Sequence, residues 1–161
     1  MCIRDRLKIV NDQQKEFSEI FHNHLLPVLK SEGIELVKAD DLNEEQLSFL
    51  NTYFDNNVLP YTQPILLMGN KIKPFLLNGA LYLSIIMKSK AKGQKEKYYA
   101  IVKIPSEELG RFIVLPDNNK KKKHVIMLDD IVRHYLNGLF PGFTILQSYS
   151  CLLYTSPSPR D

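Results

Sequence analysis

The residues that could do chemistry in this chain are four histidines, four pairs of adjacent carboxylates and a run of four lysines. His22 and His24 lie two apart, and on a helix that spacing turns their rings about 200° away from each other. They are poorly placed to bind one metal ion, which needs convergent ligands. His134 follows Asp130 by four residues, a spacing that favours a surface hydrogen bond. We expect His124 to be an ordinary histidine at the start of a strand.

The carboxylate pairs are Asp40–Asp41, Glu44–Glu45, Glu107–Glu108 and Asp129–Asp130. Each pair sits at or near the start of an expected helix, where negative charge stabilises the helix by about 0.3–1 kcal/mol. This structural role accounts for all four pairs. The sequence has neither the GxxxxGK[ST] nor the GxGxxG phosphate-binding pattern. We therefore assign no catalytic, cofactor-binding or metal-binding residue to this chain.

The strongest charge feature is Lys120–Lys123. Four adjacent cations could contact a polyanion such as nucleic acid or a phosphate chain. The alternative is a solvated loop between two strands. Because no aromatic side chains interleave with these lysines to stack on bases, we expect no nucleic-acid partner.

Composition narrows the class of protein. The 161 residues are 44% hydrophobic and 24% charged, close to the average of globular domains, with a net charge of +3. This excludes a disordered, collagen-like or fibrous chain and suits one compact domain, or one domain and a fragment. No apolar run reaches the roughly 18 residues of a membrane helix, and we identify no signal peptide.

The two ends of the chain resemble each other at the level of DNA. One codon choice for Met1–Asp5, read as its reverse complement in another frame, encodes Cys-Leu-Leu-Tyr-Thr, which is Cys151–Thr155. The pattern resembles translated sequencing-library adapter. We therefore expect residues 1–6 and 151–161 to be artefacts and exclude them from the fold. Both cysteines lie in these ends, so a disulfide framework has no support.

Three helices are expected. The apolar spacing predicts the first over residues 11–31, capped by Asn11 or Asp12 and stopped by Gly33. Pro27 should either kink this helix or begin a second short helix, because it lacks an N–H donor.

Asn43 and Gln46 form a capping-box pattern that begins the second helix, which ends near Pro60. The third helix is expected over residues 129–140, before Pro141-Gly142. Alternating apolar residues predict strands over residues 34–37, 80–88, 98–104, 111–115, 124–128 and 143–149. The order indicates an α+β fold, with N-terminal helices followed by a mainly antiparallel sheet and a packed helix.

Four segments, in order along the chain, resemble the polyphosphate kinase family of the bacterial, histidine-phosphorylating type. They are LLPVLKSEGIELV, LNEEQLSFLNTYFDNNVLPYTQPI, YAIVKIPSEELGRFIVLP and HVIMLDDIVRHYLNGLFPGFTILQSYS. Together they span nearly all of residues 20–149. None is a catalytic motif by itself, and the resemblance rests on their order.

The resemblance implies an enzyme that reversibly transfers the terminal phosphate of ATP to polyphosphate, with Mg²⁺. It implies a helical N-terminal domain, a head domain and two C-terminal domains that hold the phosphorylated histidine and most ATP and metal contacts. None of the four histidines here matches that phosphorylated residue. On this basis residues 7–32 are expected to end the helical domain and residues 33–150 to form part of the head domain.

Several further expectations follow from the resemblance. The fragment by itself is inactive, the head domain forms a homo-oligomer, and the whole protein is cytoplasmic or peripherally membrane-associated. The partners of the whole enzyme are polyphosphate and ATP or ADP. The alternative is a small non-enzymatic binding module that uses the basic loop on acidic partners.

Overall fold

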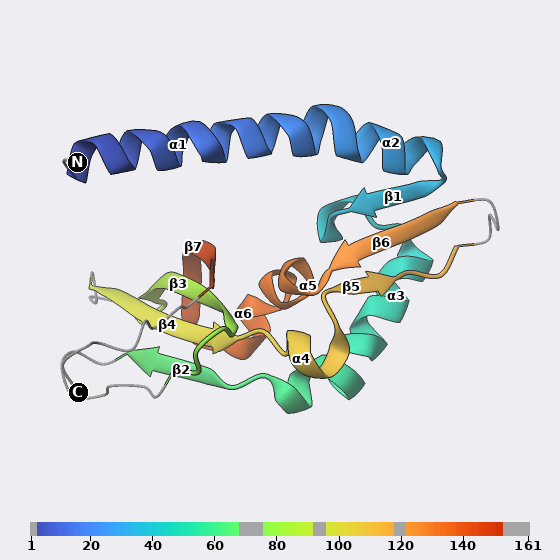
Figure 1. Cartoon of the computed structure of the whole chain (residues 1–161). Coiled ribbons are helices and arrows are strands. Elements are labelled where there is room, and N and C mark those ends of the chain that lie inside the picture. Colours follow the sequence, from blue (N-terminus) through green and yellow to red (C-terminus); the bar gives the residue numbers. More distant parts are fainter. Residues whose placement is uncertain (1–2, 68–75, 92–95, 118–121, 153–161) are drawn as a thin grey trace.

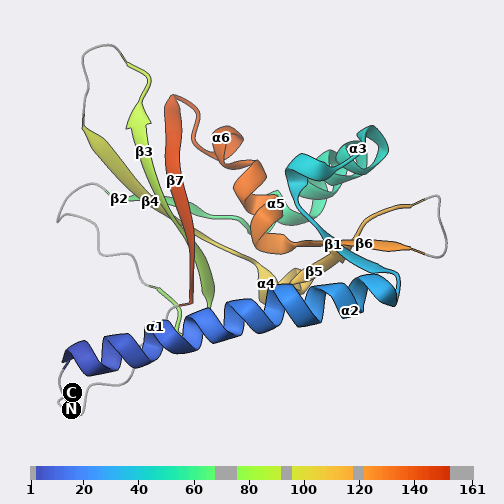
Figure 2. The same ribbon diagram turned by 90° about the horizontal axis from the view of Figure 1, so that it is seen from above.

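The computed structural model describes residues 3–67, 76–91, 96–117 and 122–152 (Figure 1). A long helical rod comes first: α1 (Ile3–Ile20), the π-helical turn η1 (Phe21–Leu25) and α2 (Leu26–Ser31). The rod runs along one side of the molecule, and α2 leads into the first strand (Figures 1 and 2).

The predicted first helix is confirmed at its end but not at its start. Pro27 lies in the first turn of the second short helix, α2, where proline is tolerated, and Gly33 follows the helix with a φ of 78°. The predicted caps at Asn11 and Asp12 are wrong because α1 already begins at Ile3. No glycine or proline interrupts the residues from Ile3 to Asp12, so the helix continues through them.

The second predicted helix is α3 (Glu44–Tyr53), which continues into η3 (Phe54–Val58) and η4 (Leu59–Tyr61). Its capping box is confirmed, because Asn43 Oδ1 accepts from the Gln46 N–H at 2.9 Å and Gln46 Oε1 accepts from the Asn43 N–H at 3.3 Å. The short turn η2 (Ala39–Asp41) precedes it.

The strands form two sheets. The smaller sheet has the order β1 (Ile34–Val37), β6 (Lys123–Met127), β5 (Phe112–Val114). β1 pairs with β6 in parallel, and β5 pairs with β6 antiparallel. β1 matches the predicted strand, and the helical turn before β5 is α4 (Ser106–Leu109).

The larger sheet has the order β2-β4-β3-β7, and all its pairs are antiparallel. Its strands are β2 (Pro64–Leu67), β3 (Leu81–Ser89), β4 (Lys97–Lys103) and β7 (Phe143–Leu152). The α+β class is therefore confirmed, and four of the five described strand pairings are antiparallel, one parallel. Cys151 and Leu152 extend β7 opposite β3, and the adapter origin of the chain ends stays a prediction.

The third predicted helix is two helices, α5 (Leu128–His134) and α6 (Leu136–Leu139), which lie between the two sheets (Figure 2). The helix breaks at Tyr135, whose φ of −91° and ψ of 6° leave the helical range. The Tyr135 ring stacks on Phe54 with centroids 4.1 Å apart, and its hydroxyl donates to Asn51 at 2.6 Å. The break thus accompanies tertiary contacts to the α3 region that helix propensity does not encode.

One hydrophobic core joins these elements. The alternate residues of β3, namely Leu83, Ile85 and Met87, are fully buried, as predicted from the alternation. Leu83 pairs with Val102 of β4 and packs in the same cluster as Ile131 of α5. The core therefore holds the larger sheet, α5 and α3 together, and it fixes the positions from which the polar groups project.

Candidate functional site

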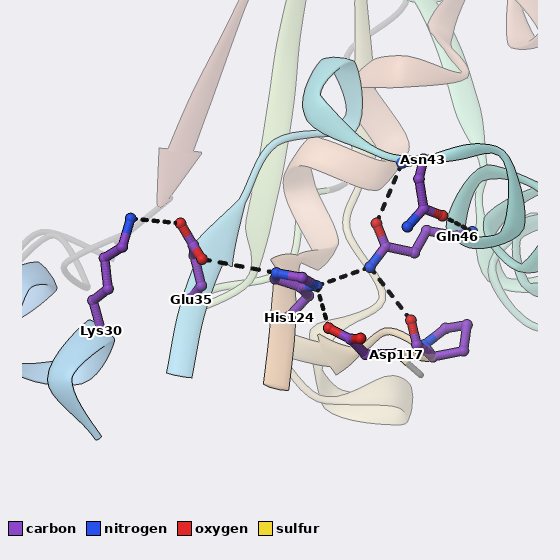
Figure 3. A network of polar contacts seen from close by, with 7 residues as sticks. Lys30, Glu35, Asn43, Gln46, Asp117 and His124 are labelled. Carbon is purple, nitrogen blue, oxygen red and sulfur yellow. Dashed lines mark hydrogen bonds and ion pairs between the residues drawn. The ribbon is translucent and has the colours of Figure 1, made fainter. Parts of the chain in front are cut away.

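The densest polar cluster lies where the smaller sheet meets the start of α3 (Figure 3). His124 of β6 is its centre. Its Nδ1 atom lies 2.8 Å from Asp117 Oδ2 and 2.9 Å from Gln46 Nε2. Gln46 is only 4% exposed, and it also donates to the Pro116 carbonyl oxygen at 3.3 Å. The cluster joins α3, the end of the β5 region and β6.

Glu35 extends the cluster toward the helical rod. Its Oε2 atom lies 3.8 Å from His124 Nε2, and its Oε1 atom accepts from Lys30 Nζ at 2.9 Å. This hydrogen bond and the charge of Lys30 lower the pKa of the Glu35 carboxyl below its ordinary value. A chain of polar contacts therefore runs from Lys30 of α2 through Glu35 of β1 and His124 of β6 to Asp117 (Figure 3).

A second polar group connects α5 to β7. Ser150 Oγ donates to Asp129 Oδ2 at 2.9 Å and accepts from Arg133 Nη2 at 2.9 Å. Arg133 Nε also lies 4.0 Å from Asp130 Oδ1. Asp130 is therefore paired with Arg133 and not with the predicted partner, His134. Burial, and then the neighbouring Asp129 charge, raise the pKa of Asp130 above its ordinary value.

A cavity of about 590 Å³ opens beside this second group, between η2 and the α5–α6 segment. Lys38 and Arg133 contribute two positive charges to its lining, and Asp40 and Asp130 contribute two negative charges. These charges cancel, so the lining has no strong preference for an anion or a cation.

Three of the four histidines lie outside the polar cluster around His124. His22 is exposed on η1, where its Nδ1 lies 2.8 Å from the Ser18 carbonyl oxygen, and His24 is exposed on the same turn. His134 is exposed on α5 with its ring against Tyr135. Among the described residues, no group of three or more His, Cys, Asp or Glu side chains is placed to hold a metal ion.

The other predicted features fall as follows. The carboxylate pairs Glu44–Glu45, Glu107–Glu108 and Asp129–Asp130 occupy the first turns of α3, α4 and α5, and Asp40–Asp41 lies in η2. Their predicted place at helix starts is therefore confirmed. Of the lysine run, Lys122 and Lys123 are exposed, whereas Lys120 and Lys121 lie outside the described residues.

Sequence reasoning missed the partners of His124. One signal was available in the sequence. Asp117 and His124 lie on either side of the lysine run, and a hairpin between the strands on its two sides brings these two residues close together. The participation of Gln46 had no such signal, because it lies 78 residues from His124. In the described part of the chain, the side chains that contact the His124 ring are those of Glu35, Gln46 and Asp117.

The described helices include none that is long and apolar enough to span a membrane.

Comparison with known proteins identifies the family to which this fold belongs. A family profile described as the polyphosphate kinase middle domain matches residues 45–153. A polyphosphate kinase of Bacillus cereus is 35% identical over 129 residues, which cover 79% of this chain and 18% of that protein. A Vibrio vulnificus polyphosphate kinase is 34% identical over 131 residues, covering 80% of this chain and 18% of that protein.

A solved structure shares the fold as well. The crystal structure of the polyphosphate kinase from Porphyromonas gingivalis superposes with a TM-score of 0.82 at 28% identity, covering 89% of this chain and 22% of that one. This chain thus spans about a fifth of the length of the relatives that it matches. The profile match across most of the chain and the shared fold establish that the chain belongs to the polyphosphate kinase family, whose middle domain is matched by residues 45–153.

Proposed function

We propose that this chain is part of an enzyme that reversibly transfers the terminal phosphate of ATP to long-chain polyphosphate. The observation that carries the proposal is the match of the polyphosphate kinase middle domain over residues 45–153. ATP and Mg²⁺ are the cofactors of the proposed whole enzyme, and we place their sites in its other domains. In this proposal the chain is a scaffold domain and holds no catalytic residue.

A chimera tests both parts of the proposal. Residues 45–149 replace the corresponding segment of the Bacillus cereus relative, and polyphosphate synthesis from ATP and Mg²⁺ is followed on gels. We expect the chimera to synthesise polymer and the 161-residue chain alone to synthesise none. Polymer made by the isolated chain would contradict the scaffold role. A chimera that melts like its parent enzyme yet makes no polymer would contradict the assignment of function.

The lysine run is proposed to guide the anionic polymer. Exposed Lys122 and Lys123 support this, because adjacent cations attract a phosphate chain in a salt-dependent way. In the chimera, replacing Lys120–Lys123 with serine should shorten the polymer and weaken the dependence of the rate on salt. A matched control in the same chimera replaces the exposed Lys88 and Lys97, paired across β3 and β4, with serine and should leave chain length and salt dependence unchanged. Unaltered chain lengths and salt dependence in the loop variant would refute the role.

We also propose that the domain forms a homo-oligomer in the whole enzyme, located in the cytoplasm or at the membrane periphery. Apolar side chains at sheet edges support this assembly. Phe112 and Val114 of the edge strand β5 are 59% and 57% exposed, and Leu146 and Tyr149 of the edge strand β7 are also exposed. Exposed apolar edge strands are surfaces that another chain readily covers.

A further inference from the structure

The smaller sheet has a second face that is apolar and lies outside the hydrophobic core. Side chains alternate between the two faces along each strand, so Ile126 and its partner Ile113 point into the core and their neighbours point the other way. This outer face carries six apolar side chains: Ile34 and Leu36 of β1, Phe112 and Val114 of β5, and Val125 and Met127 of β6. None of the six belongs to the core cluster formed by the described residues. Because a face in contact with water usually carries polar side chains, this outer face favours a covering partner.

The apolar side chains of the outer face form continuous rows across the strands. Leu36, Val125 and Val114 lie directly opposite one another on the three strands, and Phe112 lies opposite Met127. Phe112 and Val114 are 59% and 57% exposed, whereas the other three are half-buried. Figure 1 shows the three strands side by side, with α4 at the end where β5 begins. The rows therefore offer a flat apolar surface that another sheet could cover.

Opposite charges lie at the two ends of the outer face. Lys122 and Lys123 are exposed where β6 begins. Glu107 and Glu108 belong to α4, just before β5, at the end of the sheet where β6 finishes. Both approach Lys103 Nζ, at 3.9 and 3.5 Å, but the Glu107 side chain stays 68% exposed and two carboxylates outweigh one ammonium group. The outer face therefore has a basic end and an acidic end.

A second copy of the same chain fits a face with this distribution of charge. If two outer faces pack with their strands running in opposite directions, a two-fold axis relates the copies and the basic end of each lies over the acidic end of the other. Packing with the strands in the same direction would place lysines against lysines, which like-charge repulsion disfavours. Sheets that pack face to face lie about 10 Å apart, so side chains from both copies fill the space between them.

We propose that two copies of this chain associate through the outer face of the smaller sheet, with their strands running in opposite directions. The inference rests on the proposed homo-oligomer and names its interface. Val114, Val125 and Leu36 of both copies form the apolar centre. Lys122 and Lys123 of each copy lie over Glu107 and Glu108 of the other. The edge strand β7 lies outside the interface of this pair.

Light scattering after size exclusion of the 161-residue chain tests the interface, with Cys2 and Cys151 replaced by serine to prevent disulfide-linked dimers. We expect a dimer at high micromolar concentration. Val114→Glu should weaken association by about a hundredfold, because it buries an unpaired charge in the apolar centre. Leu146→Glu is the matched control, since Leu146 also lies on an exposed edge strand, and this variant should remain dimeric. The melting temperature of each variant checks that it is folded.

Charge reversal tests the orientation of the two copies. Lys122→Glu combined with Lys123→Glu should weaken association by about tenfold, and so should Glu107→Lys combined with Glu108→Lys. The chain with all four substitutions should associate like the wild type, because its two ends are again of opposite charge.

Three results would overturn the inference. The first is a monomeric wild-type chain, a measurement that needs no variant. The second is a dimer that Leu146→Glu dissociates and folded Val114→Glu does not, which would place the interface at the β7 edge. The third is a dimer that neither charge-reversed end weakens. Because these measurements use neither ATP nor polyphosphate, they are independent of the polymer synthesis that tests the proposed phosphate transfer.

Discussion

Leu83→Ala is expected to lower the free energy of unfolding by about 2.5–4 kcal/mol, because it removes a fully buried side chain from the centre of β3. Leu83 pairs with Val102 and belongs to the cluster that joins the larger sheet to α5 and α3. The truncation leaves a cavity that these elements cannot close without losing other contacts. Denaturant unfolding followed by circular dichroism measures the change.

Leu146→Ala provides the matched control, since Leu146 lies on β7 of the same sheet and is 43% exposed. The same chemical change there should cost about 0.5 kcal/mol or less, as surface substitutions usually do. Equal losses for the two variants would contradict the proposed position of the core.

Gln46→Ala is expected to lower the free energy of unfolding by about 2–3 kcal/mol, through half of a capping box and two buried hydrogen bonds. The variant loses the acceptor for the Asn43 N–H and the donor to the Pro116 carbonyl oxygen. It also leaves His124 without its amide neighbour. Thermal and denaturant unfolding of the purified chain measure the loss.

Two further variants identify the source of that loss. Gln13→Ala changes an exposed glutamine of α1 and should be nearly neutral. Asn43→Ala removes the other half of the box, and the double variant should lose less than the sum of the two singles because both act on one helix start. Strict additivity would show that the box does not act as a unit.

The elements that were predictable from the chain alone rely on contacts between residues close in sequence. The capping box joins Asn43 and Gln46, which are three positions apart, and the helix stop at Gly33 needs only a positive φ. The alternation along β3 marks Leu83, Ile85 and Met87 as one buried face before any partner strand is known. The order of four family-like segments also carried the family assignment without a catalytic motif.

The tertiary structure decided the features that depend on distant pairs. β1 lies parallel to β6 although some 90 residues separate them, and Tyr135 breaks the last helix while bonding to Asn51, 84 positions earlier. The apolar stripe of α1 also behaved unexpectedly, because Phe17 and Ile20 remain exposed in the described part of the chain. Periodicity states which side chains share a face, but only the arrangement of the other elements determines whether that face is covered.

The polar cluster around His124 also combines a feature that the sequence predicted with features that only the tertiary structure determined. Sequence placed the histidine at the start of a strand, which is where it lies. Its partners come from β1, α3 and the segment after β5, and their convergence requires the sheet order and the orientation of α3 together. Hydrogen-bond partners at such separations leave no period in the sequence, since each depends on how whole elements pack rather than on the residues beside it.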